Sequence, residues 1–348
     1  EYRRQRQMCI RDRPYAAAQS LVFGIPVQTN YDEGNQEIIG PMHRTLKRSN
    51  DCTPISGPCT RSTAFTSYVE PLMNSLDNIN VLTNTTALKL IWGKFGFNKD
   101  KVIGVEVYHN GDVTKIYTKK GVFVGLGPVG TPKFLQLSGI GERTHLENND
   151  IEVRHELPGV GEGFTDHSVY AAVYLLLGQP VALPSTVFIS FQKSGFNGNS
   201  IDIEVAYTIL PANEFASIML IVINQLRNTG VGFARVQSPN AFIEIESQFG
   251  WNVANFAPMA QALNLTRQWM SFSPLNIPVS PTEEELSFSA TFSEYLAFIY
   301  AEGSQSYFHP TGTARMGQPS DPMAVVDSNC KVIGVDTVSY THLRAHET

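Results

Sequence analysis

The sequence predicts a mixed α/β (α+β) fold, in which a ligand-binding α/β domain is interleaved with a lobe built on an antiparallel sheet. A buried strand, a glycine turn and a helix follow one another between Val122 and Leu137, and this unit carries ligands at strand ends in α/β proteins. After Asp166 the pattern changes to strand-like and then helical segments. These segments are Val169–Leu176, Ile201–Ile209, Phe233–Ile245, Phe256–Met270 and Pro281–Ala301.

Both ends of the chain lack the patterning of the rest. Residues 1–13 are basic without a hydrophobic period, and residues 339–348 break off the preceding pattern without a turn or a cap. Both stretches resemble translated sequencing-adaptor sequence, so we expect neither to belong to the fold. For this reason we give no weight to the basic start as a nucleic-acid signal, or to His342 and His346 as a metal-binding pair.

The composition is that of an ordinary globular protein. The 348 residues are 42% hydrophobic and 17% charged, and the formal net charge of −6 argues against a nucleic-acid partner. The longest apolar run, near Ile218–Ile223, is too short to span a membrane. Cys52 and Cys59 are close enough to bridge and Cys330 stands alone, which leaves the redox compartment open.

The first half of the chain predicts loops, a helix and strands in turn. Residues 14–60 are rich in turn-formers, and an apolar rhythm from Arg61 to Met73 predicts one helical face. Strands are expected at Asn80–Thr83 and Ala87–Trp92. Asn110-Gly111 lies between β-rich runs and predicts a two-residue hairpin, because both turn positions need positive φ.

A glycine-rich stretch, GPVGTPKFLQLSGIG, runs from Gly127 to Gly141. It follows the apolar run Val122–Leu126, which predicts a buried strand. Thr131 is a natural N-cap and Pro132 suits the first helical position, so we expect a helix from Thr131 to about Leu137.

A second loop, LPGVGEGFTDH, runs from Leu157 to His167. Proline and three glycines predict a tight loop with Asp166 and His167 at its exit. We expect Asp166 to cap or order this loop where the chain passes between lobes, and we do not expect His167 to be a catalyst.

The most informative stretch is FHPTGTARMG, from Phe308 to Gly317. It places His309 at the head of a turn broken by proline and glycine, directly after an amphipathic helical segment. Such a turn presents an imidazole to a pocket, where it can accept a proton from a substrate hydroxyl near neutral pH. The alternative is a turn histidine bonded to a backbone carbonyl.

These motifs resemble segments of the glucose–methanol–choline (GMC) family of flavin-dependent alcohol oxidoreductases. FHPTGTARMG resembles the family's catalytic-histidine segment, GPVGTPKFLQLSGIG its second signature, and LPGVGEGFTDH its LPGVGxNLxDH loop, with Gly163 in place of the usual asparagine. Further similar stretches are GPCTRSTAFTSYVEP (57–71), NINVLTNTTALKL (78–90), VVD (325–327) and VIGV (332–335).

The resemblance implies FAD as cofactor, a partial FAD-binding Rossmann-like domain, and an antiparallel-sheet substrate domain. A neutral His309 would then take the hydroxyl proton of an alcohol while hydride leaves for the flavin. The resemblance also implies cofactor-binding positions, which are Ala87 (through its backbone), Gly127, Thr131, Pro132, Asp166, His167 and Gly312. We expect Arg315 to pair with a carboxylate.

On this basis we expect six regions along the chain. They are adaptor-like residues 1–13, a linker with part of the substrate lobe at 14–60, part of the FAD-binding domain at 61–165, the substrate-binding domain at 166–304, the C-terminal part of the FAD-binding domain at 305–338, and adaptor-like residues 339–348.

Two family features are not found at the places where the family has them. No GxGxxG turn precedes the motifs above, since the spacing Gly125-x-Gly127-x-x-Gly130 belongs to the second signature, and the family's second catalytic His or Asn is not reached. We therefore expect the isolated chain to be inactive, with an apolar strand face near Val122–Leu126 partly uncovered. The resemblance leaves the alcohol, the electron acceptor and the compartment open, and it favours secretion because many family members are secreted.

Two alternative functions remain at this point. One is a flavin-containing hydroxynitrile lyase of the same family, and the other is a non-catalytic binding or remnant protein. A serine hydrolase is disfavoured because no GxSxG elbow is present. We expect no metal site.

Overall fold

The structure divides into two units that interleave along the sequence. It is a computed structural model that describes residues 25–27, 37–40, 46–47, 60–61, 63–73, 75–94, 101–178, 185–239, 243–247, 253–271, 276–303 and 305–340. The first unit comprises Glu1–Asn80, His167–Thr229 and Gly250–Tyr307, and the second comprises Val81–Asp166, Gly230–Phe249 and Phe308–Thr348. Cys52, Cys59, His342, His346 and the stretch 1–13 lie outside the described residues.

These boundaries differ from the sequence prediction at several places, including Asp166, which groups with the second unit. Residues 61–80 group with the first unit, whereas residues 230–249 group with the second, because their strand pairs with Glu162–Phe164. Residues 305–307 stay with the first unit, where Gln305 and Ser306 pair with Val169 and Ser168.

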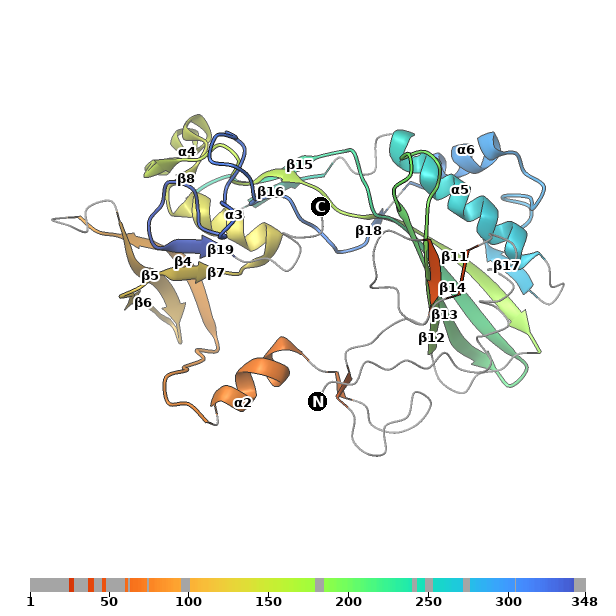
Figure 1. The fold of residues 1–348 in the computed structure, drawn as a ribbon, viewed down its shortest axis with the longest axis horizontal. Helices are drawn as coiled ribbons and strands as arrows, with labels where there is room; N and C mark the ends of the chain where they lie inside the picture. Colours follow the sequence, from red (N-terminus) through yellow and green to blue (C-terminus); the bar gives the residue numbers. More distant parts are fainter. Residues whose placement is uncertain are drawn as a thin grey trace. The chain divides into compact units, whose positions relative to one another are not determined.

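A seven-stranded sheet forms the centre of the first unit (Figure 1). Its strand order is β1-β12-β13-β14-β11-β17, with β18 also paired to β11, and the ladders between neighbours are antiparallel. The strands are β1 (Ile38–Gly40), β11 (Ser168–Leu177), β12 (Ser185–Gln192), β13 (Ile203–Asn213), β14 (Ala216–Gln225), β17 (Asn276–Ser280) and β18 (Gln305–Ser306). The predicted antiparallel lobe is therefore confirmed.

Helices α5 (Val253–Met270) and α6 (Phe292–Glu302) lie together on one side of this sheet (Figure 1). Alternate strand residues such as Tyr207, Ile221 and Tyr174 pack with the helices in one core, since successive strand side chains point to opposite faces. The other residues of β11, β13 and β14 face away from the helices. We call this second side the open face.

Smaller elements complete the first unit. They are β2 (Leu46–Lys47), β3 (Thr60–Arg61), a π-helical turn (Phe65–Val69) and α2 (Glu70–Met73). The helix predicted from Arg61 to Met73 is thus shorter than expected, and its first residue belongs to a strand.

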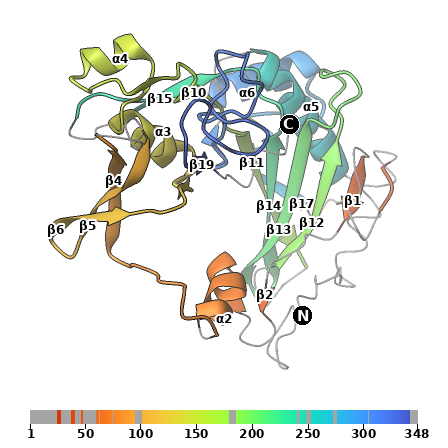
Figure 2. The same ribbon diagram turned by 60° about the vertical axis from the view of Figure 1, so that its left-hand side comes forward.

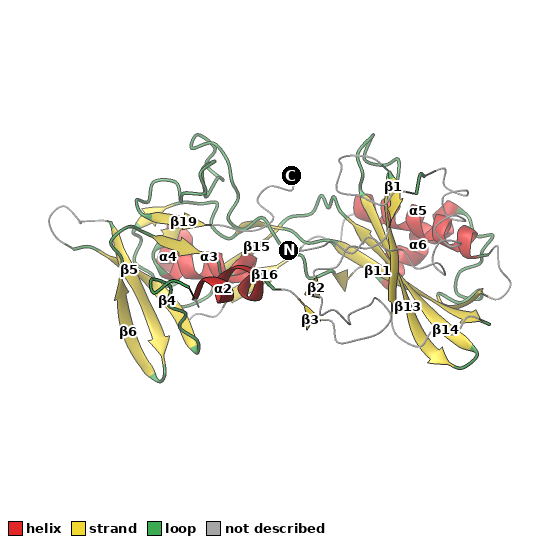
Figure 3. Ribbon diagram, turned by 60° about the horizontal axis from the view of Figure 1, so that its bottom comes forward, coloured by secondary structure: helices red, strands yellow, loops and turns green. Residues whose placement is uncertain are grey.

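The second unit contains four small sheets, which Figures 2 and 3 show from two further sides. They are β4 (Thr85–Trp92) with β5 (Val102–His109) and β6 (Asp112–Tyr117), β7 (Val122–Val124) with β19 (Val338–Tyr340), β8 (Ile140–Gly141) with β9 (His155–Glu156), and β10 (Glu162–Phe164) with β15 (Gly232–Val236) and β16 (Ile243–Glu246). Helices α3 (Gly127–Leu137) and α4 (Arg143–Asn148) accompany them.

The hairpin predicted at Asn110-Gly111 is confirmed, with φ of +50° and +100° at the two turn residues. The strand predicted at Asn80–Thr83 is absent from this described segment, and Phe233–Ile245 is two strands instead of one. Ser339 and Tyr340 were expected outside the fold, but they belong to β19, which runs parallel to β7. Their stretch Val-Ser-Tyr alternates apolar and polar residues, as a strand requires.

The apolar strand face is partly uncovered, as expected. Phe123 is 79% exposed and Leu126 45% exposed, whereas Val124 is buried. Among the described helices, none is long and apolar enough to cross a membrane. Within the same residues, no cluster of His, Cys, Asp or Glu is placed to hold a metal ion.

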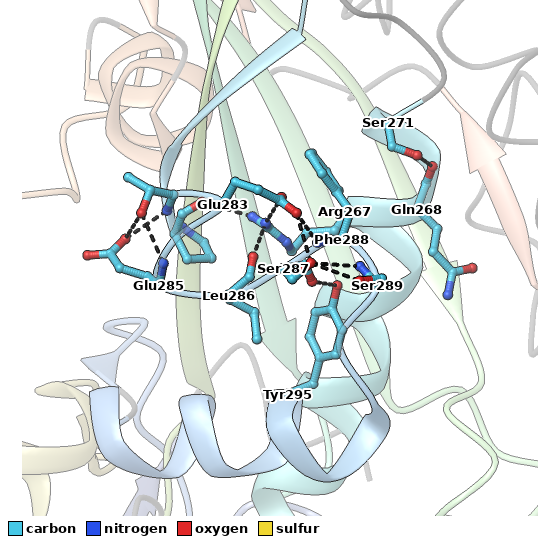
Figure 4. Close-up of polar contacts among 12 residues, drawn as sticks. Arg267, Gln268, Ser271, Glu283, Glu285, Leu286, Ser287, Phe288, Ser289 and Tyr295 are labelled. Atoms are coloured by element: carbon cyan, nitrogen blue, oxygen red, sulfur yellow. Dashed lines mark hydrogen bonds and ion pairs between the residues drawn. The ribbon is translucent and has the colours of Figure 1, made fainter.

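A buried arginine fixes the loop between β17 and α6 (Figure 4). The fully buried Arg267 on α5 donates to the carbonyl oxygens of Pro281 and Leu286, pairs with Glu283 at 3.1 Å, and stacks over Phe288. The sequence predicts one helix over Pro281–Ala301, but α6 begins only at Phe292, after Thr291 and Glu294 form a capping box. Arg267 donates to the carbonyl oxygens of Pro281 and Leu286, which would accept backbone N–H bonds in a longer helix.

We predict that Arg267→Met lowers the free energy of unfolding of the full-length protein by about 3 kcal/mol, because two buried carbonyl groups lose their donor. Denaturant titration measures this. Glu283→Gln is the matched control, since the Glu283 side chain is 48% exposed and its ion pair is worth less than about 1 kcal/mol. Equal losses in the two variants would contradict the assignment.

Candidate active site

Helix α3 begins at the end of strand β7 and contains an internal proline. The helix starts at Gly127, four residues before the predicted N-cap Thr131, so that Pro128 and not Pro132 stands in its first turn. Pro132 has no N–H, and the carbonyl of Pro128, four residues earlier, therefore receives no helical hydrogen bond from it. The hydroxyl of Thr313 donates to this carbonyl oxygen instead, at 2.6 Å.

The segment that carries His309 runs beside the loop that ends at Asp166. Thr165 and Thr311 exchange backbone hydrogen bonds of 3.0 and 2.8 Å, and the Gly161 N–H donates to the Thr313 carbonyl at 2.9 Å. The two backbones also meet at glycines. Gly312 has φ of +98°, and a Cβ on it would collide with the carbonyl oxygen of Gly163. The close approach therefore requires glycine at position 312.

Asp166 fixes the backbone of His309 directly. The Asp166 carboxylate, only 3% exposed, accepts a hydrogen bond from the His309 N–H at 2.9 Å. The residue before the histidine, Phe308, has φ of +59° and is 86% exposed. The carboxylate thus holds a turn whose backbone is unfavourable for a bulky residue. Asp166 was expected to order its own loop, and this hydrogen bond shows that it holds the turn of the His309 segment.

The structure brings together three of the motifs that the sequence analysis singled out. Gly127, Thr131 and Pro132 belong to α3, which Thr313 joins to the histidine segment, and Asp166 and Gly312 belong to the paired backbones. Ala87 lies in β4, half-buried against the core of the second unit. His167 belongs to the first unit, where its carbonyl accepts from the Tyr307 N–H.

Arg315 pairs with a carboxylate, as expected. Its guanidinium lies 2.7 Å from Asp321. The Met323 N–H first, and then this guanidinium, hold the pKa of the Asp321 carboxyl below its usual value. The pair braces the turn that follows the histidine segment.

At the start of α3, Gly127 leaves space for a flavin, whereas Thr131 and Pro132 are buried and do not. Gly127 has φ of +74°, and a Cβ there would meet nothing within 4 Å, so the end of β7 leaves room for a bound group against the backbone. Thr131 and Pro132 are buried. Burial raises the pKa of the nearby Tyr340 to about 12, with the Thr131 side chain opposing the shift. Thr131 and Pro132 therefore support the helix, and Gly127 fits the cofactor position.

Sequence reasoning missed Thr313 and the contact between Gly163 and Gly312. A signal for Thr313 was present, because a proline inside a helix leaves one carbonyl to be satisfied from outside. The glycine contact had a weaker signal, since it depends on which two loops come together.

Comparison with known proteins gives one consistent family. Two models of protein families, each described as GMC oxidoreductase, match residues 23–169 and 229–340. An oxygen-dependent choline dehydrogenase from Photobacterium profundum is 24% identical over 90% of this chain and 58% of its own length. One from Sinorhizobium fredii is 25% identical over 90% and 60%. The chain thus spans about three fifths of the length of these curated relatives.

Solved structures share the fold. Pyridoxine 4-oxidase from Mesorbium loti superposes with a TM-score of 0.76 at 19% identity, covering 95% of this chain and 64% of that one. An FAD-dependent oxidoreductase from Chaetomium thermophilum superposes with a TM-score of 0.77 at 17% identity, covering 97% and 68%. At these identities the likeness concerns the fold alone.

We predict that Gly312→Ala destabilises the full-length protein more than Gly178→Ala does. Both glycines have positive φ, which costs an alanine about 1–2 kcal/mol, but a Cβ on Gly178 would meet nothing within 4 Å. The additional loss at Gly312, measured by chemical denaturation, reports the close approach to Gly163. Equal losses at the two positions would show that the loops are not in contact.

Proposed function

Because the chain belongs to the GMC oxidoreductase family, we propose that the full-length protein oxidises an alcohol with FAD as cofactor and His309 as the general base. The observation that supports this most is the fixed His309 segment, which is held by the buried Asp166 carboxylate and by Thr313. A catalytic base needs such a defined position before its pKa matters.

In this proposal His309 accepts the proton of the substrate hydroxyl on its imidazole. Asp166 holds the backbone N–H of His309, so the orientation of the turn does not depend on the protonation state of the ring. Asp166 is therefore a positioning residue. It binds the chain and not the substrate.

The backbone at Gly127, with room beside its Cα, and that of Ala87 in β4 would hold the cofactor, while Thr131 and Pro132 shape the helix behind them. Bound FAD supplies the acceptor for the hydride that leaves the carbinol carbon. The substrate is an alcohol, and an electron acceptor must reoxidise the flavin. No nucleic acid is involved.

The relatives are named for several different substrates. They include choline dehydrogenases and pyridoxine and formate oxidases, so family membership does not fix which alcohol this protein takes. A hydroxynitrile lyase and a non-catalytic remnant remain the alternatives, and turnover of an alcohol with a redox dye separates them from the oxidoreductase.

We predict that His309→Ala in the full-length protein slows reduction of the flavin by alcohols by at least about a hundredfold, with flavin content unchanged. Anaerobic stopped-flow absorbance measures the reduction.

His109→Ala is the control, because His109 lies on the hairpin strand β5 and bonds Thr85 there. An unchanged rate in His309→Ala would remove the histidine from the mechanism. Purified full-length protein without flavin absorbance would contradict the proposed function itself.

A further inference from the structure

The open face of the large sheet carries one row of side chains that differs from the rest. Cross-strand register places Phe191, Glu204, Asn224 and Val169 side by side on β12, β13, β14 and β11. The next row toward the sheet interior is formed by Ile189, Ala206, Val222 and Ala171. These two rows are thus apolar except for a carboxylate and an amide next to each other.

Asn224 is the most informative member of this row. It is 1% exposed, and neither its amide oxygen nor its amide nitrogen has a hydrogen-bond partner among the described residues. A buried amide without partners costs about 1–3 kcal/mol for each unmet group. Leucine has the same branched skeleton without polar atoms and would avoid this cost, so packing alone does not explain an asparagine here.

Glu204 lies directly across the strand pair from Asn224, and both Glu204 and Tyr307 are only half-buried. The Tyr307 N–H donates to the His167 carbonyl, which places Tyr307 one residue beyond the pairing of β18 with β11. Burial and then the Glu204 carboxylate raise the pKa of Tyr307, so its hydroxyl keeps its proton and can donate near neutral pH.

The hydrogen-bonding groups of Asn224 and Glu204 favour some small ligands over others. The asparagine offers one acceptor and two donor hydrogens, and a hydroxyl group can satisfy both kinds because it donates and accepts. A carboxylate beside it accepts from a second hydroxyl, whereas an alkylammonium ion would leave the amide nitrogen unmet.

We propose that Glu204 and Asn224 form a binding site for two neighbouring hydroxyl groups of a small polyol. This binding site stands by itself and does not depend on the proposed function. Tyr307 directly follows β18 in the sequence.

The test uses three ligands with the same six-carbon chain on the full-length protein. Hexane-1,2,6-triol carries the vicinal pair, hexan-1-ol lacks it, and 6-aminohexan-1-ol replaces it with a cation. Binding is measured by calorimetry on dithionite-reduced protein, which cannot oxidise an alcohol. We expect the triol to bind at least about tenfold more tightly than hexan-1-ol, in line with one or two hydrogen bonds to a charged and an amide group.

Two variants test whether Glu204 and Asn224 bind the vicinal hydroxyl pair of the triol. Glu204→Gln and Asn224→Leu should each remove most of the tenfold preference while leaving hexan-1-ol binding unchanged. Asn224→Leu should also leave the unfolding midpoint unchanged or raise it. Asn255→Leu is the matched control, because Asn255 is equally buried but accepts from the Thr229 N–H and hydroxyl at 3.1 Å, so its loss should destabilise the protein.

Three results would overturn the proposal. One is equal affinity for the triol and hexan-1-ol. Another is tightest binding of 6-aminohexan-1-ol, which would show a cation site. The last is an Asn224→Leu variant that unfolds as readily as Asn255→Leu with triol binding intact, which would make Asn224 structural. Since no turnover is needed, a protein that binds the triol but oxidises no alcohol would contradict only the proposed function.

Discussion

A carbonyl oxygen that helix α3 cannot use is the constraint on which the candidate site depends. Pro132 lacks the N–H that would bond the Pro128 carbonyl, and Thr313 supplies the missing donor from almost two hundred residues further along the chain. Thr313 is 1% exposed, so water does not replace it readily. Because a buried acceptor without a donor costs about 1–3 kcal/mol, the helix and the histidine segment stabilise each other.

The remaining contacts of the site follow from this attachment. Once Thr313 is held, Thr311 lies in register with Thr165, and Gly312 must pass the Gly163 carbonyl at a distance that excludes any side chain. The same register brings the His309 N–H to the Asp166 carboxylate. The position of His309 is therefore set by backbone bonds, by the Asp166 carboxylate and by the hydroxyl of Thr313. In the proposed mechanism the imidazole accepts the proton of the substrate hydroxyl.

Local signals in the sequence were sufficient for some elements and not for others. The Asn110-Gly111 hairpin depends on two adjacent residues, and the strands of the antiparallel sheet depend on a period of two, so both could be predicted. The start of α3 was misplaced because Thr131 and Pro132 resemble the first turn of a helix. In the structure α3 already begins at Gly127. Arg267 holds the first part of a predicted helix in a loop through contacts with residues 14 to 19 positions away, which no local pattern contains.

The central claim is tested most directly by a double-mutant cycle on the full-length protein with Thr313→Val and Pro132→Ala. Alanine at position 132 restores an N–H to the helix, so the Pro128 carbonyl regains a donor within α3. The account predicts that Thr313→Val lowers the free energy of unfolding by about 1–3 kcal/mol in the wild-type background and by much less in the Pro132→Ala background. Equal and additive losses in both backgrounds would show that the hydroxyl of Thr313 does not replace the missing N–H, and the account would fail.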